Sequence, residues 1–393
     1  MKKLFLPLMI LLLAFSAKAQ ELNKIQDGIE HAQITRKVKI SDTENAPVVV
    51  NLLRLDLTKT RLDVVHAMDA AIGAEKTSSI ATRHGAVAAI NAGYFRLDGI
   101  FRGDASGVLQ IDGKLLSESF GNRIALGVLN GKDKTEIEFG HLKAYKIVGF
   151  GTDSEFVFSG INRERKINEI ILYTADFHRT TLTNADGTEI ILSDCSMRCR
   201  KVEVVESKGS SIIPPDGYVI SIGKDALEKS NNILYFAKRR QSNSKEMEIF
   251  RLAKQLDLSE TSKKSFFNKV EDIVGGNPQL VKNGKVEITW REEKSGEKHV
   301  NERHPRTAIA RLKDGRALLV TVDGRQAGVS AGMNLQELAE MLVEFNASDA
   351  MNLDGGGSTA MFLNGKVVNK PSDKEGERAV SDAILVFPRK KNL

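Results

Sequence analysis

The chain has 393 residues and carries 57 lysines and arginines against 51 aspartates and glutamates, a formal net charge of +6. The excess is small and the basic residues are scattered, so the composition argues against a nucleic-acid-binding protein. The chain is long for one domain, yet no proline- or serine-rich linker divides it. We therefore expect a polar N-terminal segment at residues 20–46, followed by one large domain at residues 47–388.

Residues 1–19 have the pattern of a secretory signal peptide. Two lysines precede an apolar run over residues 4–15, and residues 17–19 have the small-x-small pattern of a cleavage site. The run is too short to span a bilayer, although a buried N-terminal helix is an alternative. We expect cleavage after Ala19, which removes three lysines, and a periplasmic or secreted mature protein without a membrane span.

Strand patterns dominate the rest of the chain. Helices are fewer: one is expected at residues 77–83, and another begins at Asn334, with Glu337 completing a capping box. Regular βαβ alternation is missing, which argues against a Rossmann fold or a (β/α)8 barrel. The pattern predicts an α+β fold with a mixed, strongly twisted β-sheet and a few packed helices. Strands are predicted at 48–57 and 62–66 (an opening pair), 87–90, 107–111, 124–129, 169–173, 189–192, 202–205, 218–222, 306–311, 317–322, 350–353, 361–363 and 383–387.

Three turns place Asp-Gly or Asn-Gly between apolar residues, at 111–114, 282–285 and 363–366. Both residues of each pair tolerate the positive φ of a type I′ turn, so these turns predict β-hairpins. The chain has two cysteines, Cys195 and Cys199. In an oxidising compartment this spacing favours a disulfide over free thiols, and a metal site would need more ligands.

The most informative segment follows the predicted strand at 350–353. It runs from Asp354 through three glycines to Ser358 and Thr359. Glycine reaches positive φ at little cost and lets a ligand approach the backbone, and successive N–H groups can converge on an anion. A carboxylate, amides and hydroxyls at one strand end suit a sugar or phosphate ester. The alternative is a loop that only reverses the chain.

Two other strands end in similar turns. Asn91 offers a donor and an acceptor, and the nearby Tyr94 and Phe95 would suit stacking against a sugar, or else belong to the core. The turn Gly-Gly-Asn-Pro at residues 275–278 has the same form, although taken alone it is better explained as an ordinary turn before a hairpin.

Charged residues mark two further strand ends, at Arg306 and Asp323. Burying Arg306 in an otherwise apolar strand is costly without a partner, so it needs a carboxylate or faces a cleft. Arginine is the natural bidentate partner of phosphate, and the alternative is a structural ion pair. The neighbouring His304 suits a proton carrier or a surface residue, and Asp323 is followed by Gly324 in what is otherwise an ordinary turn.

These segments in order, NAGYF, GGNPQLVKNGK, HPRTAIA, LLVTVDGR and MNLDGGGSTAMFLNGK, resemble the phosphodiester glycosidase family. That family has bacterial members and an animal relative that acts on N-acetylglucosamine-1-phosphodiesters. The resemblance spans residues 48–387 and implies a single catalytic domain in which the strand ends meet in one cleft. The chain departs from the family at Ala310, where glycine is usual, and lacks a second serine after Ser358.

The resemblance implies hydrolysis of the sugar C–O bond of a sugar-1-phosphodiester in envelope or extracellular glycans, with no required cofactor. Asp354 is the first choice for the carboxylate that stabilises the sugar cation or activates water. Positive charge and N–H donors would stabilise the phosphate, while a Ca²⁺ ion held by Asp323 and Asp354 is left open. The site residues implied are Asp354, Asp323, Arg306, Asn91 and Glu189 as catalytic candidates, and Thr307, Arg325, Gly355, Gly356, Gly357, Ser358, Thr359 and Arg378 for the substrate and its phosphate.

Two other classes of function remain open on the sequence. A non-catalytic glycan-binding or polysaccharide-assembly protein of the envelope would use the same cleft, but one Trp and five Tyr are few for a sugar-stacking surface. Cleavage at the P–O bond commonly needs a metal cluster, and the sequence has no dense His/Asp cluster. The sugar, the aglycone, the anomeric outcome and the oligomeric state are not determined.

Overall fold

The computed structural model describes residues 22–150, 154–195, 199–242 and 251–389. The predicted signal peptide at residues 1–19 lies outside this part of the chain. Within it, no helix has the length and apolar character needed to cross a membrane.

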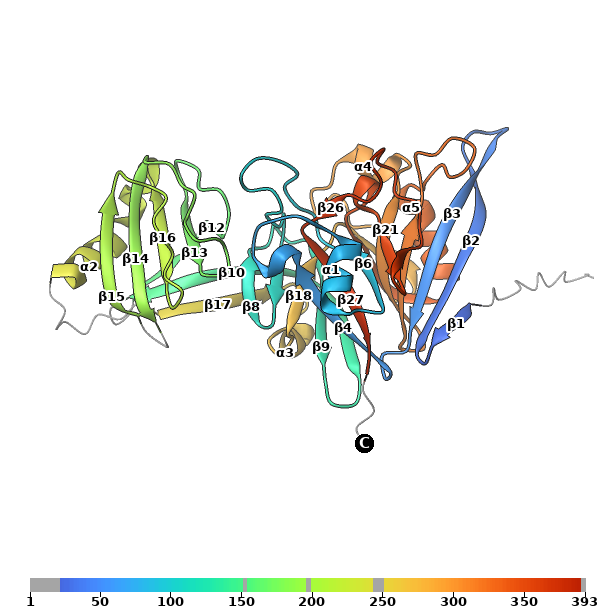
Figure 1. Cartoon of the computed structure of the whole chain (residues 1–393), viewed down its shortest axis with the longest axis horizontal. Helices are drawn as coiled ribbons and strands as arrows, with labels where there is room; N and C mark the ends of the chain where they lie inside the picture. The colour runs from blue at the N-terminus through green and yellow to red at the C-terminus, as the bar shows by residue number, and fades with distance from the viewer. Residues whose placement is uncertain (1–21, 151–153, 196–198, 243–250, 390–393) are drawn as a thin grey trace, which may run out of the picture.

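Two facing sheets and two helices form the body of the molecule (Figure 1). The apolar residues between the sheets include Leu53 and Ile309 from one and Leu62 and Ile384 from the other. Helix α5 (Leu335–Glu344) packs on the outer face of the larger sheet, and α1 (Thr77–His84) packs on the outer face of the smaller one. The larger sheet has the order β1 (Asn23–Gln26), β2 (Ile29–Lys39), β3 (Asn45–Leu55), β22 (Ala317–Val322), β21 (Arg306–Leu312), β23 (Ala347–Asn352), β19 (Gln279–Lys282), β20 (Lys285–Val286); the smaller has β25 (Lys366–Val367), β24 (Met361–Leu363), β6 (Ala88–Asn91), β27 (Asp382–Pro388), β4 (Thr60–His66).

A third sheet joins this body to a second lobe, which lies at the opposite end of the molecule from β1–β3 (Figure 1). Its long strand β10 and the partner strand β17 run toward that lobe, where helix α2 packs against a five-stranded sheet. The third sheet contains β11 (Ser154–Val157), β10 (Thr135–Phe150), β9 (Ile124–Asn130), β18 (Asp272–Gly275), β7 (Leu109–Ile111), β8 (Lys114–Ser117) and β17 (Arg251–Leu258). The lobe contains β12 (Gly160–Ile161), β13 (Ile170–Thr174), β16 (Tyr218–Gly223), β14 (Gly187–Cys195), β15 (Cys199–Glu206) and α2 (Asn231–Ser242). The remaining short strands and α-helices, outside these sheets and the lobe, are β5 (Glu75–Lys76), β26 (Ala379–Val380), α3 (Lys264–Phe267) and α4 (Glu297–Asn301).

The α+β prediction is confirmed in its content, which is mostly strand with few helices, but the expectation of one mixed, twisted sheet is wrong. The strands form several sheets that are almost wholly antiparallel, with β12–β13 a parallel pair. The predicted opening pair is also separated, because β3 and β4 lie in the two facing sheets. The N-terminal segment differs from expectation as well: β2 pairs with β3 along its whole length and extends the larger sheet.

Local predictions agree with the structure. Asn334 accepts a hydrogen bond from the Glu337 N–H at 2.9 Å, and the Glu337 side chain accepts from the Asn334 N–H at 3.0 Å. The three predicted hairpin turns have positive φ at both central residues, and they connect β7–β8, β19–β20 and β24–β25. Cys195 and Cys199 face each other across β14–β15 and form a disulfide in the structure.

Candidate active site

The glycine-rich segment connects the two facing sheets of the body, because it follows β23 of one and leads into β24 of the other. Two of its glycines have no room for a side chain. A Cβ on Gly355 would lie 2.7 Å from the Pro305 carbonyl oxygen, and one on Gly357 would lie 2.1 Å from Nη2 of Arg378. Gly356 has φ of +61°. The run of glycines is therefore required by close neighbours and by backbone conformation.

Asn91 joins three segments that are far apart in sequence. Its Nδ2 donates to the Asp354 carbonyl oxygen at 2.6 Å, and its Oδ1 accepts from the Thr307 hydroxyl at 2.8 Å and from the Ala360 N–H at 3.1 Å. The Thr307 and Thr359 hydroxyls lie 3.4 Å apart. The structure thus brings together Asn91, Thr307, Asp354 and Thr359, and their hydrogen bonds hold the glycine loop in place.

Asp354 as a whole residue is partly buried. Burial raises its pKa to about 7, and the charge of Asp382 adds to the rise, while Ser358, the Gly355 N–H and Arg378 act against it. The Gly355 N–H donates to Oδ1 at 2.9 Å, whereas the buried Ser358 hydroxyl has no hydrogen bond of good geometry. A carboxyl with this pKa exchanges its proton near neutral pH, as an acid or base in catalysis must.

Two arginines flank the glycine loop. Arg378 forms a bidentate pair with Asp373, with distances of 2.8 and 3.0 Å. The Arg325 guanidinium lies 3.2 Å from the place that a Cβ on Gly356 would occupy, and the residue is exposed. Its Nη2 is 3.3 Å from Nδ1 of His304. These guanidinium groups supply positive charge beside the loop, where a phosphate could accept hydrogen bonds.

Arg306 does not lie as expected. Its side chain is buried, and it donates to the Met333 carbonyl oxygen at 2.9 Å and to the His299 and Glu302 carbonyl oxygens at 2.8 Å each. Among the described residues no carboxylate forms an ion pair with it, so the predicted alternative of a structural ion pair is wrong. Burial and the charge of Arg325 lower its pKa to about 10. The guanidinium anchors the segment that precedes β21.

Two predicted carboxylates have other surroundings. Asp323 is buried and accepts from Asn369 Nδ2 at 3.3 Å and from the Lys370 N–H at 3.1 Å, so it ties β22 to the segment after the glycine loop. Glu189 lies on β14 in the second lobe and accepts from Thr183 and from the Ser211 N–H. Its expected place beside Asp354 is therefore wrong, because β14 belongs to a separate sheet at the far end of the molecule (Figure 1).

The glycine amides are also less available than expected. The Gly355 N–H bonds to Asp354, and the Gly356 N–H donates to the Pro305 carbonyl oxygen at 2.9 Å. Two of the three donors assigned to a phosphate are thus already satisfied within the protein. The anion site that remains is the pair of arginines, Arg325 and Arg378.

Asp382 and His299 escaped the sequence analysis, and Tyr94 was named there only for stacking against a sugar. Asp382 begins β27, is buried, and accepts from the Gly93 N–H at 2.5 Å; burial raises its pKa. The Tyr94 hydroxyl accepts from Asn352 Nδ2 at 2.7 Å and lies 3.3 Å from Nε2 of His299. Phe95 is buried core, so it offers no stacking surface. Asp382 stands directly before the predicted strand at 383–387, and a charged residue at that strand end could have indicated it.

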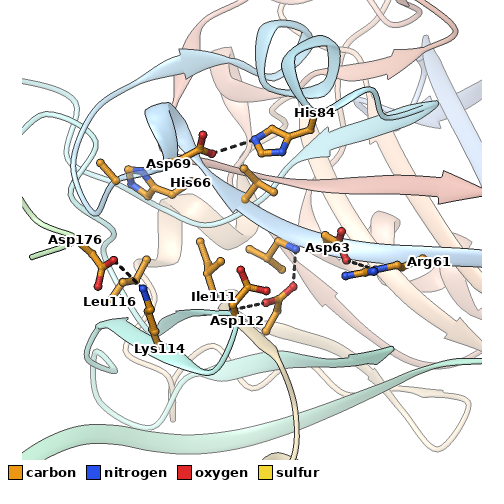
Figure 2. A pocket seen from close by; sticks show the side chains of 14 residues that line it. Arg61, Asp63, His66, Asp69, His84, Ile111, Asp112, Lys114, Leu116 and Asp176 are labelled. Atoms are coloured by element: carbon orange, nitrogen blue, oxygen red, sulfur yellow. Dashed lines mark hydrogen bonds and ion pairs between the residues drawn. The ribbon is translucent and has the colours of Figure 1, made fainter. Parts of the chain in front are cut away.

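A separate cavity of about 420 Å³ lies beside β4 and the β7–β8 turn (Figure 2). Its acids are largely matched by neighbours: Asp63 pairs with Arg61 at 2.9 Å, and Asp176 pairs with Lys114 at 3.2 Å. None of the predicted site residues lines it. In the described part of the chain, no group of three or more His, Cys, Asp or Glu residues is arranged to hold a metal ion.

Comparison with known proteins matches this chain to one family and to solved folds. Residues 197–387 match the family model described as phosphodiester glycosidase. Over 115 residues the chain is 34% identical to N-acetylglucosamine-1-phosphodiester alpha-N-acetylglucosaminidase of Mus musculus, a match that covers 27% of this chain and 22% of the mouse protein. The chain therefore matches less than a quarter of the length of that relative.

Two solved structures share the fold. A Burkholderia pseudomallei protein, named as a candidate for export, has a TM-score of 0.71 and 22% identity, and the match covers 87% of this chain and 74% of that one. The zebrafish N-acetylglucosamine-1-phosphodiester alpha-N-acetylglucosaminidase catalytic domain, described as auto-inhibited by its pro-peptide, has a TM-score of 0.51 and 17% identity. That match covers 93% of this chain and 86% of the zebrafish chain.

Proposed function

Since residues 197–387 match the family model described as phosphodiester glycosidase, we propose that the chain hydrolyses the sugar C–O bond of a sugar-1-phosphodiester. The observation that carries the proposal is the Asp354 carboxyl, whose pKa is raised to about 7 beside two arginines. The signal-peptide pattern supports export, and glycans of the envelope or the extracellular space are the proposed substrates.

The proposed mechanism divides the work between the carboxylate and the arginines. Cleavage of the anomeric C–O bond builds positive charge on the sugar, which the Asp354 carboxylate stabilises directly or through an activated water. The phosphate leaves as an anion, so its departure depends less on protonation than on nearby positive charge. Arg325 and Arg378 supply that charge, and Asn91 and Thr307 hold the loop that carries Asp354.

The test is product analysis with a panel of sugar-1-phosphodiesters in oxygen-labelled water. Cleavage at the C–O bond places the label on the released sugar, and cleavage at the P–O bond places it on the phosphate. Label in the phosphate would contradict the proposed reaction. Glycan binding without turnover of any member of the panel would favour the alternative, a non-catalytic glycan-binding or assembly protein.

The pH dependence of the rate tests the charge state of Asp354. If its carboxylate is the active form, kcat/KM rises about tenfold per pH unit below pH 7 and levels off above it. The rise follows because protonation below the pKa removes the charge that stabilises the sugar cation. A rate that falls as the pH rises through 7 would instead assign the carboxyl the role of an acid.

Replacing Gly357 with alanine should weaken substrate binding through Arg378. The new Cβ would lie 2.1 Å from Arg378 Nη2 and 2.2 Å from Asp373 Oδ1, so both side chains must move. We expect KM for the phosphodiester to rise about tenfold. Gly296→Ala is the matched control, because nothing lies within 4 Å of its Cβ position. An unchanged KM in Gly357→Ala would show that Arg378 does not bind the phosphate.

A further inference from the structure

A cleft of about 510 Å³ lies between the body and the second lobe. Residues 95–96 and 104–107, between β6 of the body and β7 of the third sheet, and residues 117–120, at the end of β8, line one side of the cleft. Residues of the lobe from 163 to 169 line the other side. Ion pairs cross the cleft and hold its two sides together. Arg163 donates to Glu118, directly after β8, at 2.6 Å and to Glu169 on the lobe at 2.8 Å, so the cleft is a built feature of the fold.

Asp104 lines this cleft without a hydrogen bond to its carboxyl among the described residues. Burial raises its pKa to about 8; Glu118 and Glu164 add to the rise, while Arg163 and Arg96 oppose it. At neutral pH the group is therefore mostly a carboxylic acid, which can donate one hydrogen bond and accept others. This group is therefore free to form hydrogen bonds with a polar ligand in the cleft.

The charges around the cleft balance when Asp104 is protonated. A ligand with a net charge gains little from such a lining, whereas an uncharged ligand with many hydroxyls can use donors and acceptors of both kinds. The three carboxylates are Glu118, Glu164 and Glu169, and the three cations are Arg96, Arg163 and Lys166; Ser106, Ser117 and Ser119 add hydroxyls.

An aromatic surface lies at the same place. Phe120 is 54% exposed although its side chain is large and apolar. The guanidinium carbon of Arg123 lies 4.5 Å from the centre of the Phe120 ring and packs against one face of that ring. A fixed, exposed ring beside mixed polar groups can stack on the apolar face of a sugar.

The cleft adjoins the candidate active site. Residues 105–107 line both the cleft and a small cavity of about 10 Å³ that also contacts Gly93, Tyr94 and Asp382. The Ser106 N–H donates to the Tyr94 carbonyl oxygen at 2.7 Å. The cleft and the surroundings of Tyr94 and Asp382 therefore share part of their lining.

We propose that this cleft binds uncharged sugar units of the substrate's glycan beyond the phosphodiester. This inference rests on the proposed function only in taking the bound glycan to be part of the enzyme's substrate. Its other content, a binding site for neutral oligosaccharides on Phe120, Asp104 and the Arg163 ion pairs, stands on the geometry of the cleft.

The test is calorimetric titration of the full mature protein with maltotetraose, cellotetraose and tetra-N-acetylchitotetraose, and with the charged tetragalacturonate. We expect saturable binding of at least one neutral sugar in the millimolar range or tighter, and weaker binding of tetragalacturonate. Phe120→Ala should weaken that binding about tenfold. Tyr235→Ala is the matched control, because Tyr235 is 59% exposed on α2, in the second lobe; it should bind as the wild type does.

The pH dependence gives a second readout. Binding should weaken between pH 7 and 9 as Asp104 loses its proton, and Asp104→Asn, which keeps the size and the donor, should remove that dependence. No saturable binding of any of the three neutral sugars at ~10 mM would overturn the proposal, as would equal binding by Phe120→Ala and Tyr235→Ala. Hydrolysis of a simple sugar-1-phosphodiester without oligosaccharide binding would contradict the binding role of the cleft and leave the proposed reaction standing. Oligosaccharide binding without hydrolysis would contradict the proposed reaction and leave the binding role of the cleft standing.

Discussion

Replacing Asp354 with asparagine should lower kcat for a sugar-1-phosphodiester by roughly a thousandfold. The amide keeps the size of the side chain but removes the charge that stabilises the sugar cation or activates water. Circular dichroism should show an unchanged fold. Asp314→Asn, in the exposed turn between β21 and β22, is the control and should turn over substrate as the wild type does. Near-normal turnover by a folded Asp354→Asn variant would contradict the role we assign to this carboxyl.

The same variant should be more stable than the wild type at alkaline pH. Because folding raises the pKa of Asp354 from 3.8 to about 7, the protonated carboxyl stabilises the fold fully below pH 3.8, and this stabilisation is lost as the pH rises through 7. Asparagine resembles the protonated form at every pH. We expect Asp354→Asn to have the higher Tm at pH 8 and a similar Tm at pH 4, as measured by calorimetry. A lower Tm at pH 8 would show that the carboxylate is not strained by burial.

Replacing Arg306 with methionine should lower the free energy of unfolding by about 3 kcal/mol or more. Methionine fills much of the same space, but it leaves three backbone carbonyl oxygens without the donor that they share in the folded protein. The measurement is denaturant unfolding followed by fluorescence. Because His299 and Glu302 precede β21, the loss of this anchor should also loosen the segment that contains His304.

Arg316→Met is the matched control for Arg306, because Arg316 is partly exposed and paired with Asp314 at the surface. Exposed pairs contribute at most about 1 kcal/mol, so its unfolding should change little. If Arg306→Met instead unfolds like the wild type and raises KM for the phosphodiester, then Arg306 binds the phosphate and the structural role is wrong.

Local features of the chain could be predicted because they depend on neighbours in sequence. The three Asp-Gly or Asn-Gly turns and the capping box at Asn334 are each complete within four residues. The strand that delivers Asp354 was likewise predictable from its apolar run and the glycines that follow. The stacking role of Phe95 failed because whether an aromatic residue faces solvent depends on what packs over it.

The partners of buried charged groups were not predictable. Arg306 in an apolar strand indicated a partner, but three carbonyl oxygens satisfy it, two from the segment just before β21 and one from Met333. A carbonyl group is present at every residue, so the sequence does not show which ones accept. Glu189 had the right residue type and the right strand pattern, yet it lies in another lobe. Asp323 follows its predicted strand and is occupied by Asn369, which lies 46 residues further along the chain.

The sequence by itself determined the hairpin turns, the helix start at Asn334, most of the strands, and the glycine loop that carries Asp354, because backbone conformation and apolar periodicity are local properties. Only the tertiary structure decided that β3 and β4 lie in separate sheets, that the Arg306 side chain bonds to backbone carbonyl oxygens while the Arg325 and Arg378 side chains lie beside the loop, and that Asp382 raises the pKa of Asp354. Burial and electrostatic coupling depend on which distant segments pack together, and strand pairing between sheets is set by the whole core.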